Sequence, residues 1–385
     1  MRNHHLTLLF LLTMTANATD RIVAPGATLP RYASISAALS AAADNDRILV
    51  VPSIYTENLT IDKSVEILSM VPGRRYTATG NLLIAPPVQT VKRIVVHDLE
   101  LLGNISTGGQ VNHPNIIVLT GCRTGRIDFG LNFSWRIALA NDSILGRLFL
   151  PGGTLVGSYV RGDTLGGGGF KVLTSTGSNR PLVLIGNILG DPYEADKPIG
   201  SCAIDLFSAD TIRFENNHVR LYREHYVSEP ICLNSAYNTS ASAVRLLNNT
   251  FIRSATAGSV GPIIADQTIG YVESRNNFFL GPITAPIFSH PYTDEWNLFS
   301  TDQEQVDPAT GRPIAGSICT DVGDPDGRYN DLDLSRNDAG CYGGSFSRDL
   351  FDDPPTGTAE ILWSHVVRRV FSSVPVGIDA SCTDQ

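Results

Sequence analysis

Lysine is scarce in this chain of 385 residues, which has Lys63, Lys92, Lys171 and Lys197 and no others. The formal net charge is -9 at pH 7, and arginine carries most of the positive charge. Proteins that bind nucleic acid present a basic face, so this composition argues against a nucleic-acid partner. Beyond its first residues the sequence also lacks an apolar stretch long enough to cross a bilayer, and we expect no transmembrane segment.

Several motifs of known chemistry are missing as well. No CxxC spacing suggests zinc, and neither a nucleotide-binding glycine loop nor a GxSxG elbow is present. The glycines of "GDTLGGGGFKV" do not form a P-loop, because Lys171 is misplaced for one. Methionine is rare and the histidines are scattered, whereas a copper site needs such ligands clustered. Helical periodicity is confined to Ile35–Ala43 and Ala359–Ser373.

The chain does begin with a short apolar run, Leu6 to Met14, after a mildly basic lead. Ala16-Asn17-Ala18 then gives the small-x-small pattern that signal peptidase cuts. We interpret residues 1–18 as a signal peptide and expect a mature protein that is secreted, periplasmic or at the cell surface. Six cysteines suit an oxidising compartment, and their pairing is open. Cys319 and Cys341 bracket an Asp-rich stretch and are the favoured disulfide.

Between the two helical segments the sequence consists of short apolar runs broken by Gly, Asn, Asp and Pro, which is typical of many short strands. Four runs share one shape: "PLVLIGNILG", "TIRFENNHVRL", "AVRLLNNTFIR" and "YVESRNNFFLG". Their asparagines Asn187, Asn217, Asn249 and Asn277 lie 30, 32 and 28 residues apart. This near-constant period predicts stacked coils, each burying an apolar face on its neighbours. Asparagine suits the bend because it tolerates left-handed backbone geometry and can hydrogen-bond to the asparagine of the next coil.

The first coil carries a more specific pattern. In Ile35–Leu68 a short helix leads into a strand, Ser53-x-Tyr55-x-Glu57 follows, and Ile61-x-Lys63 precedes the next strand. This module resembles the opening of right-handed parallel β-helix proteins of the pectin-lyase-like fold. It occurs in pectin esterases, copper-handling periplasmic proteins and many uncharacterised exported proteins, so the resemblance implies a fold and not a function.

The Asp-rich stretch "DVGDPDGRYNDLDLSRNDAGCYGG" resembles the closing motif of a group of exported bacterial β-helix proteins, approximately "GDP…YND-x-D-G-S-R-N-D-x-G-A-Y-G-G". Leu334 stands where the motif has Gly, and Cys341 stands where it has Ala. We therefore expect an all-β fold: a single-stranded right-handed parallel β-helix over residues 19–300, with a short N-terminal capping helix. An Asp-rich loop and one helix would close it over residues 301–385. We expect a monomer.

Three interpretations of the Asp-rich stretch are open. Crowded carboxylate and amide oxygens suit calcium, which takes about six to eight oxygen ligands. The candidate ligands are Asp324, Asp326, Asn330, Asp331, Asp333 and Asp338. Alternatively, Arg328, Arg336 and backbone amides hold the segment, or it forms an active site. We favour a structural calcium ion, because crowded carboxylates need a counter-charge. An active site is the least favoured, because the segment follows the repeats and does not face the stack.

Two clusters are candidates for ligand binding or catalysis. Alignment on the asparagines places Val183, Arg213, Arg245 and Glu273 in one outward column with Glu215 nearby, while Ile212, Phe214, Val244, Leu246 and Val272 point inward. Adjacent guanidiniums could hold the carboxylates of an acidic sugar chain, or Glu215 and Glu273 could simply neutralise them. In the loop "LYREHYVSEP", His225 is a candidate base beside Arg223 and Glu224, and Tyr226 could stack on a sugar ring.

The leading hypothesis from the sequence is an exported β-helix protein that binds extended polysaccharide, acidic chains included, without catalysis. One alternative is a calcium-dependent carbohydrate-active enzyme such as a polysaccharide lyase, with His225 or an arginine as its base. The other is a structural envelope or surface protein. The sequence signatures of polygalacturonases, pectin esterases and known calcium-dependent lyases are missing.

Overall fold

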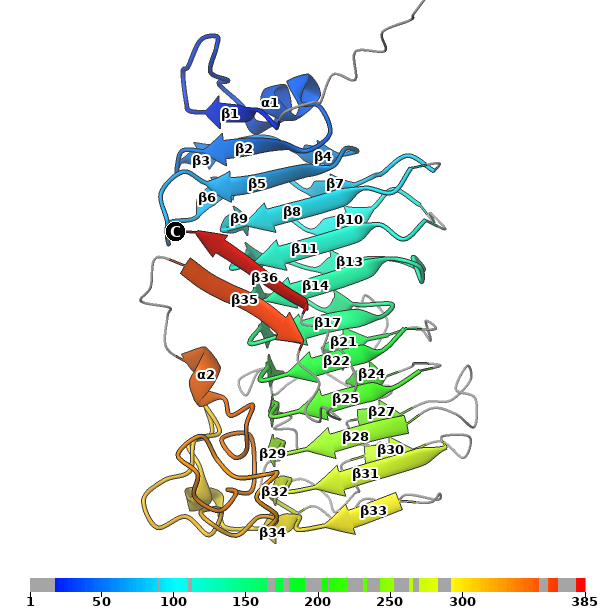
Figure 1. The fold of residues 1–385 in the computed structure, drawn as a ribbon, viewed down its shortest axis with the longest axis vertical. Helices are drawn as coiled ribbons and strands as arrows, with labels where there is room; N and C mark the ends of the chain where they lie inside the picture. The colour runs from blue at the N-terminus through cyan, green and yellow to red at the C-terminus, as the bar shows by residue number, and fades with distance from the viewer. Residues whose placement is uncertain are drawn as a thin grey trace, which may run out of the picture.

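The structure, a computed structural model, describes residues 18–88, 90–109, 113–164, 170–175, 180–190, 203–206, 208, 210–220, 231–233, 243–252, 263–265, 270–282, 292–352, 359–365 and 379–384. Three long parallel sheets run along it, and each coil of the chain contributes a strand to one sheet after another (Figure 1). This is the right-handed parallel β-helix that the sequence predicts. None of the described helices is long and apolar enough to cross a membrane.

We name the sheets A, B and C in the order in which a coil visits them. Sheet A contains β1 (Asp20–Val23), β2 (Asp46–Val50), β5 (Val65–Ser69), β8 (Arg93–His97), β11 (Ile116–Thr120), β14 (Arg136–Ala140), β17 (Gly153–Val156), β22 (Leu182–Ile185), β25 (Ile212–Glu215), β28 (Ala243–Leu247), β31 (Tyr271–Arg275) and β33 (Tyr292–Glu295). Sheet B contains β3 (Ile54–Tyr55), β6 (Tyr76–Ala78), β9 (Leu99–Leu101), β12 (Arg123–Thr124), β15 (Ser143–Ile144), β18 (Tyr159–Val160), β23 (Ile188–Leu189), β26 (His218–Arg220), β29 (Thr250–Ile252), β32 (Phe278–Leu280) and β34 (Leu298–Ser300). Sheet C contains β4 (Leu59–Ile61), β7 (Leu82–Ile84), β10 (Ile105–Thr107), β13 (Ile127–Asp128), β16 (Leu148–Phe149), β21 (Leu173–Thr174), β24 (Ile204–Leu206), β27 (Ile231–Leu233) and β30 (Ile263–Ala265).

The core is a stack of apolar columns, because successive residues of a strand point to opposite faces of its sheet. In β5, Ile67 is buried while its neighbours Glu66 and Leu68 are partly exposed. The parallel register places Ile67 beside Ile48 of β2 and Val96 of β8. Repeated from coil to coil, this pattern forms one continuous core along the axis.

A capping helix closes the N-terminal end, as predicted. Helix α1 (Ile35–Ala41) begins after Ser34, and the Glu57 carboxylate accepts hydrogen bonds from its first two amides at 2.8 and 2.9 Å. At the other end, Lys63 Nζ donates to the carbonyls of Leu39, Ser40 and Ala42, at 3.1, 3.1 and 2.8 Å. Both charges complement the helix dipole. Glu57 and Lys63 of the opening module therefore hold the cap in place.

A turn of two residues connects sheet A to sheet B and repeats from coil to coil. The first has a left-handed backbone: φ is 66° at Gly186, 55° at Asn216 and 58° at Asn276. Glycine and asparagine adopt this conformation at little cost. The predicted asparagines occupy the second position, so the left-handed geometry belongs to the residue before them.

The second turn position forms a hydrogen-bonded ladder along the axis, as predicted. The backbone N–H of Asn187 donates to Oδ1 of Asn217 at 3.1 Å, and that of Asn217 donates to Oδ1 of Asn249 at 2.9 Å. Each Nδ2 also donates to a carbonyl of the preceding coil, as Asn217 does to Leu184 at 2.9 Å. The same ladder runs on from Asn249 through Asn277 to Asn297.

The ladder also extends towards the N-terminus through side chains that the repeat pattern does not include. Ser158 N–H donates to Asn187 Oδ1 at 2.9 Å, Asp142 N–H donates to Ser158 Oγ at 3.1 Å, and Cys122 N–H donates to Asp142 Oδ1 at 2.7 Å. Asp142 is buried, and its Oδ2 has no hydrogen-bond partner among the described residues. On the other rungs an asparagine Nδ2 occupies the position of this oxygen. By register, Asp142 Oδ2 therefore faces the carbonyl of Leu119 on the preceding coil.

A closing segment, residues 301–352, returns along the outside of this turn. The Nδ2 of Asn248 donates to Asn337 Oδ1 at 2.7 Å and to the Asp338 carbonyl at 3.1 Å. Asn216 donates to the carbonyls of Cys341 and Gly343, and the Asp324 amide donates to Asn276 Oδ1 at 2.8 Å. The left-handed asparagines of three coils thus bind residues of the closing motif.

The segment ends on two glycines of the same turn column, Gly157 and Gly186. Arg348 donates to the Gly186 carbonyl, and Phe351 of α2 (Asp349–Asp352) lies so close that a Cβ at Gly186 would be 2.2 Å from its ring. Leu334, which replaces the glycine of the closing motif, adopts a left-handed φ of 70°. The turn that favours glycine is therefore kept with leucine in its place.

Two sequence predictions for the C-terminal part are wrong. Ala359–His365, predicted as helix, forms β35, which pairs antiparallel with β36 (Asp379–Asp384). A short apolar segment fits either structure, and its distant partner strand decides between them.

Cys319 and Cys341 are free, buried thiols and form no disulfide. Cys319 packs in an apolar cluster with Ile252, and Cys341 Sγ faces the Gly311 carbonyl. The predicted signal peptide, but for residue 18, and the side chains of the other cysteines except Cys122 lie outside the described residues.

Asp142→Asn is expected to stabilise the protein, because the amide keeps the bond from Cys122 and adds a donor towards Leu119. Burial raises the pKa of the Asp142 carboxyl from 3.8 to about 8, against the amide hydrogen bonds that lower it. The folded chain therefore binds this proton more tightly than the unfolded chain, and stability falls as pH rises between these two values. Urea unfolding should show almost no gain at about pH 4 and a gain of roughly 2–5 kcal/mol at about pH 8.

Asn187→Asp is the matched control, since it places a carboxyl on another rung of the same ladder. It should destabilise the protein by an amount that grows with pH. A gain from Asp142→Asn that is equal at both pH values would contradict a buried, protonated carboxyl on the ladder.

Candidate functional site

The predicted arginine column is present, but each arginine is paired within the protein. Strand register places Arg213 beside Arg245, and Arg245 beside Glu273. Arg213 donates to both carboxylate oxygens of Glu215, at 3.0 and 2.9 Å, and Arg245 donates to Glu273 at 2.8 Å. The five residues predicted to point inward are all buried: Ile212, Phe214, Val244, Leu246 and Val272. The column thus has the arrangement in which glutamates neutralise the arginines.

The closing segment lies against this column and limits its exposure. The Arg213 guanidinium lies 5.9 Å from the ring centre of Phe346, and Tyr329 Oη donates to Glu273 at 3.5 Å. The side chain of Arg213 is 19% exposed and that of Glu215 is 1% exposed. Arg213 and Glu215 therefore form a largely buried pair, and binding of a sugar carboxylate at Arg213 remains a prediction.

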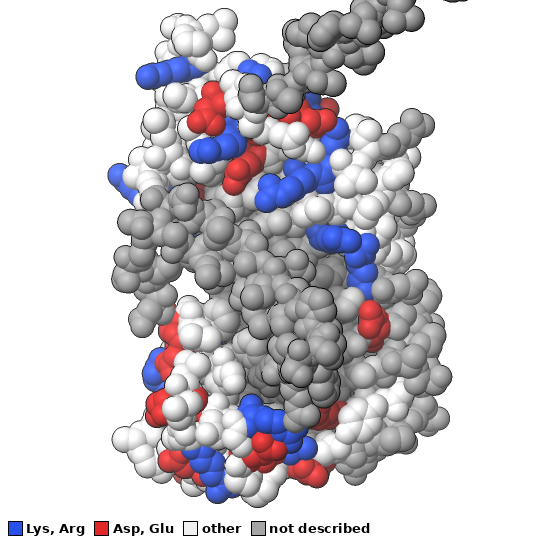
Figure 2. All heavy atoms as spheres, in the orientation of Figure 1, with Lys and Arg blue, Asp and Glu red and all other residues white. Residues whose placement is uncertain are grey.

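The acidic residues of the closing segment are distributed among separate protein partners. Asp324 pairs with Arg275 and Asp326 pairs with Arg328. The other carboxylates accept backbone amides: Asp331 from Asp338 and Gly344, Asp333 from Ser335, and Asp338 from Asp321. Asn330 donates to the Leu334 carbonyl. Acidic and basic side chains accordingly lie intermixed at the lower end of Figure 2.

Calcium binding by this segment remains a prediction. Among the residues that the structure describes, no three His, Cys, Asp or Glu side chains are grouped so as to hold a metal ion. Arg336 donates to the carbonyls of Gly323 and Val322 at 2.8 and 3.2 Å. In this arrangement the segment is held by arginines and backbone amides, which is the alternative interpretation of the stretch. The other predicted cluster, His225, Arg223, Glu224 and Tyr226, lies outside the described residues.

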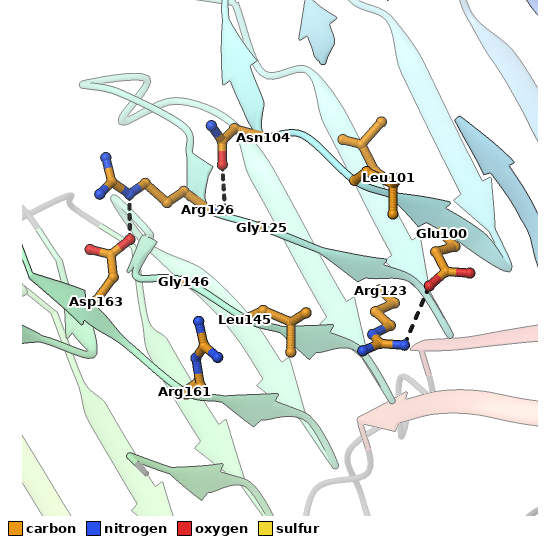
Figure 3. Close-up of a pocket in the computed structure, with 11 residues that line it drawn as sticks. Glu100, Leu101, Asn104, Arg123, Gly125, Arg126, Leu145, Gly146, Arg161 and Asp163 are labelled. Atoms are coloured by element: carbon orange, nitrogen blue, oxygen red, sulfur yellow. Dashed lines mark hydrogen bonds and ion pairs between the residues drawn. The ribbon is translucent and has the colours of Figure 1, made fainter. Parts of the chain in front are cut away.

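A groove that the sequence did not indicate opens where sheet B turns into sheet C. It has a volume of about 440 Å³ and crosses four successive coils, from β9 to β18 (Figure 3). Its lining combines arginines, carboxylates and leucines: Glu100, Leu101, Leu102, Asn104, Arg123, Gly125, Arg126, Leu145, Gly146, Arg161 and Asp163. An open channel of this mixed character is suited to an extended ligand that carries both polar groups and apolar faces.

One wall of the groove is an ion pair between neighbouring strands. Thr124 of β12 points inward and is buried, so Arg123 points outward. Register places Arg123 beside Glu100 of β9, and its Nη1 lies 3.3 Å from Glu100 Oε1. Both side chains remain partly exposed, at 49% and 30%. This pair presents a surface that is close to neutral.

A second asparagine ladder leads to the opposite wall. The Asn81 amide donates to Asn58 Oδ1, the Asn104 amide to Asn81 Oδ1, and the Arg126 amide to Asn104 Oδ1, each at 2.8 Å. At Arg126 the column changes from asparagine to arginine. The regular turn of the first coils therefore fixes the position of the Arg126 backbone along the axis and places its guanidinium at the rim of the groove.

Arg126 then reaches across one coil to Asp163. The ion pair between Arg126 Nε and Asp163 Oδ2 passes over Gly146, which separates the two in the stack. A Cβ at Gly146 would lie 2.7 Å from Arg126 Cγ and 3.0 Å from Asp163 Oδ2. Gly146 is thus required for space, since any side chain there would push the pair apart.

Arg161 is the remaining cation of the groove. It follows β18, and its backbone N–H donates to the Ile144 carbonyl, which places Arg161 beside Leu145 on the preceding coil. Its Nε is buried without a partner, and within the described residues its guanidinium takes part in no ion pair or hydrogen bond. In Figure 3 it lies between Leu145 and the Arg126–Asp163 pair. Arg161 is the group of the groove best placed to receive an anion from outside.

Comparison with known proteins leaves the function open. The sequence matches no protein family and no curated protein. Among solved structures, the chain is similar to the crystal structure of pectate lyase Pel9A, with a TM-score of 0.45 and 12% sequence identity over 85% of this chain and 98% of that chain. A likeness this distant carries no argument about activity.

Arg213→Ala is expected to lower stability, because it leaves the Glu215 carboxylate buried without its partner. Loss of one member of a largely buried pair should cost roughly 2–4 kcal/mol in urea unfolding. Arg245→Ala is the matched control: its side chain is 39% exposed and Arg275 remains near Glu273. It should cost less than about 1 kcal/mol. Equal losses in the two variants would contradict the difference in burial.

Proposed function

We propose that this protein binds extended polysaccharide in the groove on the B–C turns and leaves the chain intact. The single observation that carries the proposal is the groove itself, which runs across four coils and holds the Arg161 guanidinium, for which the described part of the chain supplies no partner. A solenoid offers such a ligand the same turn at regular intervals of about 4.8 Å. Sugar chains match this lining because their hydroxyl groups can pair with the arginines while their C–H faces cover the leucines.

Binding without catalysis is favoured by the state of the two carboxylates of the groove. Glu100 pairs with Arg123, and Asp163 pairs with Arg126. A general acid or base must be able to reach the substrate proton and exchange it, whereas these carboxylates are already bound to guanidiniums. A lyase with an arginine as base is the rival proposal, and a structural protein without glycan affinity is the third.

The test is to incubate the full chain with acidic and neutral polysaccharides, with and without calcium, and to measure both retention and product masses. We expect retained polymers of unchanged mass. Leu102→Asp, at a side chain that is 63% exposed in the groove, should weaken retention about tenfold or more by placing a charge against the sugar face. Val88→Asp, at a side chain that is 65% exposed outside the groove, is the control and should bind normally.

Shortened chains with one unsaturated end would overturn the proposal in favour of a lyase. If no polysaccharide is retained, the proposal fails, and a structural protein without glycan affinity is the proposal that remains. Equal effects of Leu102→Asp and Val88→Asp would show that binding occurs elsewhere on the molecule, with the arginine column and the 222–229 loop as the next surfaces to vary.

Calcium in the closing segment is a separate proposal with its own test. The proposal is supported by the crowding of carboxylates around Asp331. Burial, and after it repulsion from Asp338 and Asp333, raises the pKa of Asp331 to about 7, while the hydrogen bond from the Gly344 amide lowers this pKa. Burial and the neighbouring Asp321 and Asp333 also raise the pKa of Asp338. A cation would relieve this repulsion, but it would have to displace protein donors that now hold the carboxylates.

Thermal unfolding in calcium and in chelator checks this. Bound calcium should raise the melting temperature by a few degrees, which corresponds to about 1 kcal/mol or more. Asp331→Asn should remove that response, while Asp62→Asn, outside the segment, should keep it. Identical melting curves in calcium and in chelator would contradict the proposal.

A further inference from the structure

The charges of the groove leave one anion site. Among the residues that the structure describes, three arginines and two carboxylates line it, namely Arg123, Arg126, Arg161, Glu100 and Asp163. Two of the arginines are paired with the two carboxylates, and Arg161 is the third. Arg147, on the turn of the preceding coil, does not line the groove. The groove can therefore neutralise one external carboxylate without breaking an existing pair.

The surroundings of Arg161 are unfavourable for a second anion. Beside it on the preceding coil lies Leu145, and Leu102 is exposed further along the same groove. A carboxylate placed against these leucines would lose hydration without gaining a partner. One placed at either ion pair would meet Glu100 or Asp163, and like charges at short distance repel. The parts of the groove next to Arg161, which Leu145 and Leu102 line, are thus suited to neutral sugars.

We infer that the groove selects glycans with sparse carboxylates: one acidic sugar bound by Arg161, with neutral sugars lying over Leu102 and Leu145. A densely charged polyuronate is excluded as the preferred ligand, since its neighbouring carboxylates would fall on the leucines and the ion pairs. This inference rests on the proposed function, because it names the class of polysaccharide that the groove binds. A planar guanidinium suits the task, as it can hold one carboxylate through two parallel hydrogen bonds.

Titration with three oligosaccharides of equal length tests the inference: one neutral, one with a single carboxylate, and one with a carboxylate on every sugar. The single carboxylate should improve affinity about tenfold over the neutral chain, through a charge-assisted hydrogen bond. A carboxylate on every sugar should not improve the affinity beyond that of the chain with a single carboxylate. The logarithm of the affinity should fall with the logarithm of salt concentration with a slope near that of one released ion.

Arg161→Gln supplies the matched variant. It should make the singly charged and neutral chains bind equally, because the preference for one carboxylate depends on the guanidinium. Arg136→Gln, at an exposed position on sheet A, is the control and should keep the preference.

Tighter binding of the fully charged chain, with a steep salt dependence, would overturn the inference while leaving polysaccharide binding in place. Equal affinity of the unmodified protein for all three chains would also overturn it. If none of the chains binds, both the inference and the proposed function fail.

Discussion

The two-residue turn between sheets A and B is the constraint on which the rest of this structure depends. A left-handed residue reverses the chain, and the residue after it hydrogen-bonds to its counterpart on the next coil, as Asn217 does to Asn249. These side chains are buried, so their polar groups must be satisfied, and the ladder satisfies them only if every coil keeps the same register. The turn therefore fixes the height of each strand and, with it, the position of every outward side chain.

The outer side of the same turn determines which surface stays open. Asn216, Asn248 and Asn276 bind the closing segment, which covers β26, β29 and β32 of sheet B. His218 is completely buried there, and burial lowers its pKa to about 3, so it is a neutral part of the interface and has no access to a ligand. On the earlier coils the outward residues of sheet B, such as Arg123, remain accessible, and the groove lies beside them.

The fold could be predicted from the sequence because its signals are local and repeated. The asparagine period predicted the ladder and the inward core, and the opening module predicted α1, whose ends Glu57 and Lys63 bind. The hairpin of β35 and β36 could not be predicted, since pairing partners about twenty residues apart have no local periodicity in common. The groove was also missed: its arginines lie on coils where serine, aspartate and cysteine replace the ladder asparagines, so the repeat is weak there. A glycine at the B–C turn of each of these coils, Gly125 and Gly146 among them, is the signal that was present.

The most direct test of the account is a crystal structure of the full chain soaked with a polysaccharide fragment that carries a single carboxylate. We expect the carboxylate at the Arg161 guanidinium and sugar rings over Leu102 and Leu145, with the Arg126–Asp163 pair intact. A fragment bound instead at Arg213 and Arg245, with their glutamates displaced, would contradict the groove as the binding site and restore the column that the sequence first indicated.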